Sequence, residues 1–402
     1  MHIHNITGKY NRAVPLFLLW AAGLAGMLGS CKRAMDAPIL RVTDAVRDSS
    51  GDIRTVLTSP ACSCTLFDHA FSRASLDSPF LFYTVLAPTD SAMTAAGLTA
   101  AAIDALTVDS LNKIVGYQLV QGAFGGDTSV LYNDTLSVVL PTVRKDVEAV
   151  LSGSSLLPYY YQQNLHIWSR DAFYVNGVSS GAGKAPMKAS NGWIYPINRV
   201  LSAPTQSVWS ILQVRPELSL YLAAIRLVDS IASQNYVYGQ VYDSVIFSNG
   251  NYVNYAAFPL VNVTVLAPTN DAFAAAGFNT IDDIRRLALQ TLPGGANFDA
   301  LDSVLKLHYL YTPGAPSILY QDMLYSPLIN NGIYNSNSWY VTQYASTPGA
   351  TPVYPQFTNV NGTVDVQWNP NLPPASLPAG SGPLLATNGV IYESSQLFYP
   401  HN

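Results

Sequence analysis

The chain has 402 residues and a formal net charge of −5, and only 11% of its residues are charged, against about 25% in an average globular protein. A nucleic-acid partner would need a basic face, so this charge balance argues against one. Tyrosine, serine, threonine and asparagine take the place of charged residues, which is typical of the neutral, hydrogen-bonding surface of exported binding proteins.

The first 30 residues predict an export signal that is not part of the fold. Lys9 and Arg12 precede an apolar stretch, residues 13–27, that is too short to span a bilayer comfortably. Residues 28–31 read Leu-Gly-Ser-Cys and resemble the cleavage site of bacterial lipoproteins. We therefore expect a lipid anchor on Cys31, followed by a tether over residues 31–43. The alternative is an ordinary signal peptide in which Cys31 falls there by chance.

Two predicted helices, residues 53–57 and 66–74, open a first domain that we place at residues 44–204. Cys62 and Cys64 lie between these helices. The oxidising cell envelope permits a disulfide, but a bridge between such close residues constrains little of the unfolded chain. A metal site would need ligands beyond the nearby His69. We expect a structural role, with redox chemistry or metal binding as the alternatives.

A nearly continuous apolar run, residues 80–87, predicts a buried strand that ends at Pro88, because proline cannot donate to a ladder. Thr89 can then cap a helix that carries Asp90 in its first turn, where the helix dipole favours negative charge. Thr269 and Asp271 can do the same in the second domain. Apolar residues at helical spacing from Leu111 to position 118 predict an amphipathic helix with one core-facing stripe.

Two motifs in the first domain resemble catalytic or nucleotide-binding signatures only superficially. Residues 177–181 match the bare G-x-S-x-G pattern around Ser179, but residues 182–186 cannot start the helix that a nucleophile elbow needs. Lys184 follows a glycine but lacks the upstream glycine and the magnesium-binding hydroxyl of a phosphate loop. We therefore expect no catalytic residue, no metal and no cofactor.

A short linker, residues 202–207, leads to a second domain that we place at residues 207–400. An apolar-rich helix over residues 218–231 comes first. The alternating pattern of residues 261–266 then predicts a strand with one buried face. The predicted helix at residues 301–310 carries His308 where the first domain has glutamine.

The two domains repeat three sequence blocks in the same order, about 180 to 200 residues apart. Such self-similarity indicates two copies of one domain. The blocks are T-V-L-A-P-T at residues 84–89 and 264–269, A-A-G at residues 95–97 and 275–277, and N-G-x-I-Y at residues 191–195 and 388–392. The Asn-Gly pairs predict turns that lead into the last strand of each copy.

The repeated blocks resemble the fasciclin-type adhesion domain. That family has a strand ending in T-V-F-A-P-T, a helix ending near a Tyr-His pair, and a closing N-G-V-I-H segment. The resemblance covers residues 44–400 and implies an α+β fold, each domain a small β-sandwich or wedge flanked by helices. Tyr195 and Tyr392 depart from the family's usual histidine, and both domains carry extra loops.

Five residues of the second domain are candidate ligand-binding positions. The resemblance implies His308 and Tyr309, because the Tyr-His region of animal members has been tied to receptor binding. A buried histidine that holds a loop is the alternative for His308. Aromatic residues of the long insertion add Trp339, Tyr340 and Trp368, which could stack on sugars or anchor a protein.

The resemblance implies a non-catalytic lipoprotein of the cell envelope, in the outer membrane at its surface or periplasmic face. Its expected partners are a protein, an extracellular-matrix component or a glycan, together with the membrane through Cys31. Tandem copies suit weak binding multiplied by avidity. The alternatives are an accessory glycan-binding lipoprotein of a nutrient importer, an envelope hydrolase supported only by Ser179, and a structural spacer in the periplasm.

Overall fold

A computed structural model describes residues 51–76, 82–126, 131, 138–144, 147–151, 155–159, 162–168, 172–234, 263–288, 300–310, 355–360, 363–368, 371–377 and 383–399. The predicted signal peptide (residues 1–30), Cys31, the tether, Trp339 and Tyr340 lie outside these residues. Within the described part of the chain, no helix combines the length and apolarity needed to cross a bilayer.

The first half is built around a four-stranded sheet with strand order β2-β1-β10-β9. Strand β1 (Tyr83–Pro88) pairs in parallel with β10 (Gly192–Ile197), although more than a hundred residues separate them. Strands β2 (Leu119–Gln121) and β9 (Met187–Ala189) flank this pair in antiparallel orientation. A parallel pair needs a crossover connection, and here it contains every other described element of the half except α2 and α3, which precede β1.

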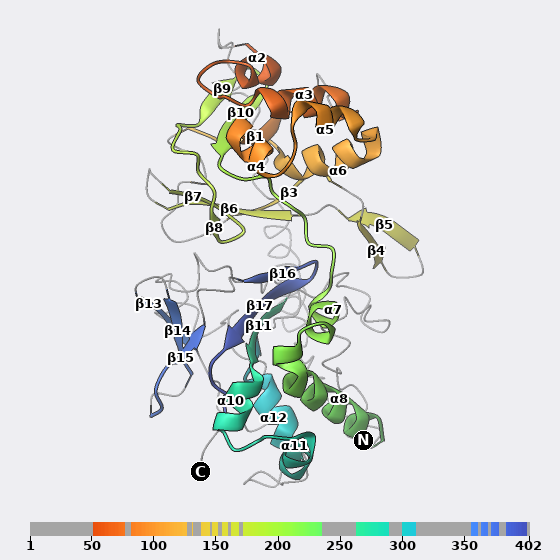
Figure 1. The fold of residues 1–402 in the computed structure, drawn as a ribbon, viewed down its shortest axis with the longest axis vertical. Coiled ribbons are helices and arrows are strands. Elements are labelled where there is room, and N and C mark those ends of the chain that lie inside the picture. The colour runs from red at the N-terminus through yellow and green to blue at the C-terminus, as the bar shows by residue number, and fades with distance from the viewer. Residues whose placement is uncertain are drawn as a thin grey trace, which may run out of the picture. The chain divides into compact units, whose positions relative to one another are not determined.

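Helices cover one face of this sheet and further strands cover the other (Figure 1). The helices are α2 (Ile53–Leu57), α3 (Thr65–Arg73), α4 (Asp90–Ala95), α5 (Ala100–Ala105) and α6 (Val108–Gln118). The second sheet contains β3 (Val138–Pro141), β6 (Gln162–Trp168), β7 (Ala172–Val175) and β8 (Val178–Ser179). Strands β4 (Val147–Leu151) and β5 (Ser155–Tyr159) form a separate hairpin.

The alternation of side chains along β1 and β10 divides the core of the first half into two clusters. Val85 and Ile194 pack among the helices. Leu86 and Tyr195 point to the opposite face and pack with residues of the second sheet, among them Phe173, whose ring stacks on Tyr195 at 4.7 Å. The central sheet is therefore buried on both faces, as expected for its continuous apolar sequence.

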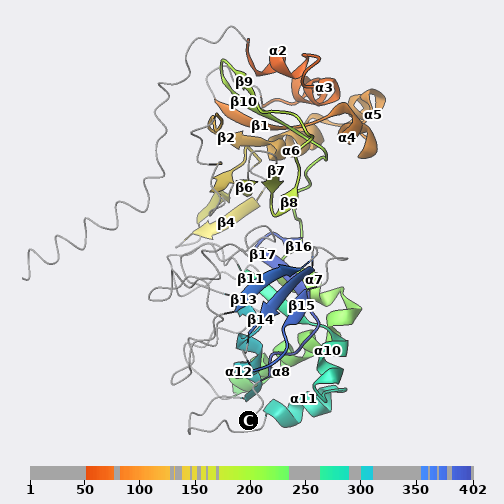
Figure 2. The same ribbon diagram turned by 90° about the vertical axis from the view of Figure 1, so that its left-hand side faces the viewer.

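The second half repeats this sheet with strand order β12-β11-β17-β16. Strand β11 (Val263–Pro268) pairs in parallel with β17 (Gly389–Ser394), and β12 (Tyr309–Leu310) and β16 (Leu384–Ala386) flank them. One face is covered by α7 (Val208–Gln213), η2 (Pro216–Leu218), α8 (Ser219–Gln234), α10 (Asn270–Ala275), α11 (Ile281–Ala288) and α12 (Ala300–Lys306). The other carries the sheet of β13 (Gln356–Val360), β14 (Thr363–Gln367) and β15 (Ala375–Leu377) (Figure 2).

The α+β fold class predicted from the sequence is confirmed. In the described residues, each half has its own sheet and its own hydrophobic clusters, and no cluster draws on both halves. The domain boundaries at residues 44–204 and 207–400 stay predictions. The predicted helix starts are confirmed at Thr89 and Thr269, whose hydroxyls cap α4 and α10 by accepting from backbone amides three residues on.

Two details of the sequence interpretation are wrong. The alternating pattern of residues 261–266 predicts one buried face, but all residues of β11 are buried. Val265 packs on the helices while Leu266 packs on the second sheet, so both faces are covered. The helix predicted at residues 301–310 is also shorter than expected, because α12 ends at Lys306 and Tyr309–Leu310 form β12 beside β11.

Candidate functional site

His308 lies in the turn that follows α12, in the core of the second half, with none of its surface exposed. Its Nε2 is 2.8 Å from the backbone amide of Phe398, which can only donate. The proton of the neutral ring is therefore on Nδ1, which donates to the carbonyl of Val304 at 2.9 Å. Burial lowers the pKa of His308 to about 3, so the ring is neutral at physiological pH.

Gln118 makes the same connection in the first half. Its amide oxygen accepts from the backbone amide of Leu201 at 3.2 Å, and its amide nitrogen donates to Leu201 and Ile114 carbonyls at 2.8 and 3.2 Å. Leu201 and Phe398 both lie a few residues after the last strand of their halves. Gln118 and His308 thus make equivalent hydrogen bonds that connect a helix to the segment after the last strand. This equivalence supports the structural alternative for His308.

Tyr309 and Trp368 also lie in the core. Tyr309 is 1% exposed and sits in β12 opposite Val265. Trp368 is 8% exposed, and its ring stacks on Phe398 at 5.3 Å, which in turn stacks on His308 at 4.5 Å. His308 and Trp368 thus belong to one buried aromatic stack with Phe398 between them, whereas Tyr309 packs in the separate cluster on the helix-covered face of the sheet. Their burial therefore does not favour direct contact with a ligand.

The residue that follows each T-V-L-A-P-T block caps a helix other than its own. The carboxylate of Asp90 accepts from the amide of Leu66 at 2.8 Å and from the hydroxyl of Thr65 at 2.9 Å, at the start of α3. Asn270 accepts from the amide of Leu220 at 3.0 Å, at the start of α8. The sequence predicted only that such residues favour the first turn of their own helix. Nothing in the local sequence indicates this second helix.

The asparagine of each N-G-x-I-Y block has a similar role. The side-chain oxygen of Asn191 accepts from the amide of Ile53 at 2.9 Å, and that of Asn388 accepts from the amide of Val208 at the same distance. These amides are at the first residues of α2 and α7, where backbone donors have no partner within the helix. The predicted turns are present, and they also hold the opening helix of each half against its last strand.

We expect Asp90→Ala to lower the free energy of unfolding of the first half by about 1–2 kcal/mol, because two donors at the start of α3 lose their acceptor. Asp90→Asn is the matched control, since Asn270 does the same work in the second half. Urea unfolding followed by circular dichroism measures both. A cost for the asparagine variant equal to that of the alanine variant would contradict the capping role.

Ser179 is not at a nucleophile elbow. It is an exposed residue of β8, which follows the tight turn at Asn176 and Gly177 and pairs with β7. The chain continues into an isolated bridge between Gly181 and Ile197, and no helix begins there. The neighbouring Ser180 is buried and accepts from the guanidinium of Arg199 at 3.0 Å. Residues 177–181 therefore lack the strand-turn-helix geometry of a nucleophile elbow.

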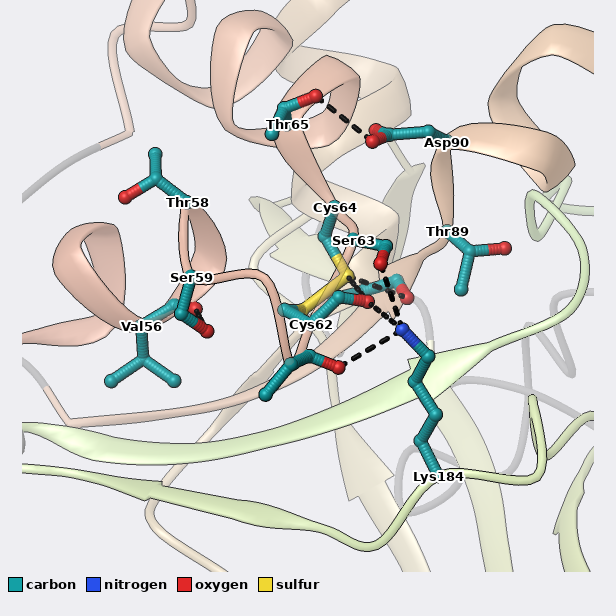
Figure 3. The surroundings of a disulfide bond; sticks show 12 residues. Val56, Thr58, Ser59, Cys62, Ser63, Cys64, Thr65, Thr89, Asp90 and Lys184 are labelled. Atoms are coloured by element: carbon teal, nitrogen blue, oxygen red, sulfur yellow. Dashed lines mark hydrogen bonds between the residues drawn. A yellow bond between two sulfur atoms is a disulfide. The ribbon is translucent and has the colours of Figure 1, made fainter.

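Cys62 and Cys64 form a disulfide in the loop between α2 and α3. Both residues are fully buried, although the loop's Ala61 is exposed. The ammonium group of Lys184 reaches this loop from the segment before β9 and donates to the carbonyls of Ala61 and Cys62 and to the hydroxyl of Ser63 (Figure 3). These distances are 2.8–2.9 Å. Lys184, dismissed as a phosphate-loop residue, thus has a structural partner.

The described part of the chain holds no cluster of three or more histidine, cysteine, aspartate or glutamate residues placed to bind a metal ion. No protein-family model and no curated protein matches the chain. A solved structure that resembles it is a FAS1 domain pair from the insect cell adhesion molecule fasciclin I. That match covers 84% of this chain and 92% of the other, with 13% sequence identity and a TM-score of 0.33.

Proposed function

We propose that this chain is a non-catalytic cell-envelope lipoprotein of two fasciclin-type domains that mediates adhesion or ligand binding at the cell surface. One observation carries the proposal: the residues repeated between the halves are occupied in holding each half together. The threonines cap α4 and α10, Asp90 and Asn270 cap α3 and α8, and Asn191 and Asn388 cap α2 and α7.

Repeated residues that serve only structural contacts are what we expect of a scaffold, a fold that carries recognition sites elsewhere. Any recognition chemistry then comes from segments that differ between the copies, since function resides in sites placed on a fold. Two such scaffolds in one chain allow two weak contacts to act together, provided that both reach the same partner surface. The mature chain would carry a net charge of −7, which favours a protein, matrix component or glycan over nucleic acid.

The location is tested by digesting intact cells with a protease and blotting for the chain, with lysed cells as the control. Loss of the protein from intact cells is expected for a surface lipoprotein. Protection until lysis would contradict surface adhesion and favour a periplasmic partner. A Cys31→Ala variant tests the anchor in parallel, because loss of the lipid should release the protein from the membrane fraction.

Ligand binding is tested on the secreted form of the chain with glycan and matrix-protein arrays. For any ligand found, we expect Trp339→Ala/Tyr340→Ala to weaken retention at least tenfold, as loss of two aromatic anchors would. Val214→Ala is the matched control, because Val214 is 64% exposed and has no proposed role. Trp368 is left intact because its removal would disturb the core. Equal retention of all three proteins would exclude the glycan-platform alternative.

A further inference from the structure

The loop that joins α2 to α3 is held by two separate devices. One is the Cys62–Cys64 disulfide. The other is the ammonium group of Lys184, which lies outside the loop and donates hydrogen bonds to two of its carbonyls and one of its hydroxyls (Figure 3). The loop then reaches the repeated motif, because the amide of Asp90 donates to the carbonyl of Ser63 at 2.8 Å. The disulfide, Lys184 and the start of α4 therefore meet in one contiguous hydrogen-bonded cluster.

The corresponding segment of the second half, before α8, has no disulfide. Asp90 caps α3 at Leu66 and Asn270 caps α8 at Leu220, so these two positions correspond. Four residues before Leu66 and Leu220 are Cys62 and Pro216, so these two residues also correspond. The carbonyl of Pro216 accepts from the side chain of Asn270 at 2.9 Å. Proline stiffens a chain through its own ring. A reductant can open the disulfide of the first half, but it cannot change Pro216 in the second.

The disulfide contributes little as a staple of the whole fold. It links residues two apart in sequence, and the entropy removed from an unfolded chain grows with the length of the closed loop. Its effect is therefore local, on the loop that carries the carbonyls of residues 61 and 62, which are two of the three acceptors of Lys184. The exposed Pro60 and Ala61 directly precede Cys62, so local opening of the loop would admit a reductant to the buried sulfurs.

We propose that the Cys62–Cys64 disulfide is a redox-sensitive lock on this corner of the first half. A dithiol reductant opens it by attack of one thiolate on a cystine sulfur, which gives a mixed disulfide and one free cysteine. The second thiolate of the reductant then displaces the other cysteine. Two electrons and two protons pass to Cys62 and Cys64, and the reductant becomes its own disulfide. The freed loop turns its carbonyls away from Lys184.

The test measures the reactivity of the Lys184 amine. The full mature chain is reduced with dithiothreitol, desalted without oxygen and treated briefly with an amine-acetylating ester, and acetylation of each lysine is read by mass spectrometry. We expect acetylation of Lys184 to rise roughly tenfold on reduction, because hydrogen bonds that restrain a charged donor are lost. Lys113, a partly exposed lysine paired with Asp109 on α6, is the internal control and should not change.

The variant Cys62→Ala/Cys64→Ala should show the high reactivity of Lys184 with or without reductant. Circular dichroism checks that this variant and the reduced protein stay folded. Unchanged Lys184 reactivity after both thiols have been detected by alkylation would overturn the proposal. So would a disulfide that dithiothreitol reduces only after urea unfolding, because that bond would be structural and insensitive in the native protein.

Discussion

Replacing Gly192 or Gly389 with alanine is expected to lower the free energy of unfolding of the affected half by about 3 kcal/mol. A Cβ atom at Gly192 would lie 2.0 Å from the carbonyl oxygen of Tyr83, and one at Gly389 would lie 2.4 Å from that of Val263. These are backbone oxygens of the paired central strands, so a change of side-chain conformation cannot relieve the clash. The strands themselves would have to separate at the start of the parallel pair.

Urea unfolding of each variant, followed by circular dichroism and tryptophan fluorescence, measures this loss. Gly181→Ala is the matched control, because a Cβ there would meet its nearest atoms at 3.7 and 3.8 Å, which is ordinary contact. We expect that variant to unfold within about 0.5 kcal/mol of the parent chain. A Gly192 variant as stable as the Gly181 variant would show that the central strands do not approach as closely as described.

His308→Ala is expected to cost the second half about 3–4 kcal/mol, because it leaves the amide of Phe398 without an acceptor and opens a cavity beside its ring. His308→Gln should recover most of this loss, since Gln118 makes the corresponding bonds in the first half. Urea unfolding compares the three proteins. Equal destabilisation by alanine and glutamine would contradict the structural equivalence of the two positions.

The same histidine predicts a dependence of stability on pH. Its pKa is lowered to about 3 in the folded chain, whereas the unfolded value is near 6.5. Between these values the unfolded state binds the proton more readily, so stability falls by up to about 1.4 kcal/mol for each unit that the pH drops. The loss begins as the pH falls through about 6.5 and ends near pH 3.

Comparison with His308→Gln isolates this contribution. Burial raises the pKa of Asp302 in the same half, which acts in the opposite direction, but Asp302 is present in both proteins. The difference in free energy of unfolding between parent and variant should therefore shrink or reverse as the pH falls from 7 to 4. A difference that stays constant over this range would mean that folding does not lower the pKa of His308.

Local patterns predicted the elements whose causes are local. The caps at Thr89 and Thr269 need only a side chain and an amide three residues away, and α6 follows from its apolar spacing. The doubled fold followed from the repeat itself. By contrast, the burial of both faces of β11 depends on strands β13 to β15, which lie about a hundred residues further along the chain.

The candidate site was harder to predict for the same reason. Whether His308 faces a ligand or the core is decided by Phe398, 90 residues away, and the capping of α3 by Asp90 spans 24 residues. The C-x-C spacing left the state of Cys62 and Cys64 open, since a disulfide depends on the conformation of the loop that carries them. The match between Gln118 and His308 was the one sequence signal that indicated a structural role.

The pairing of each half's first central strand with its last has a consequence for synthesis on the ribosome. A nascent chain cannot complete its first central sheet until residue 197 has been made, but that sheet then needs nothing from the second half. The enclosed segment can also lengthen cheaply, because each doubling of a flexible loop costs only about 0.6 kcal/mol in closure entropy. Evolution could therefore exchange the enclosed segments of β1–β10 and β11–β17 while keeping the frame, and the unlike insertions of the two halves fit such a history.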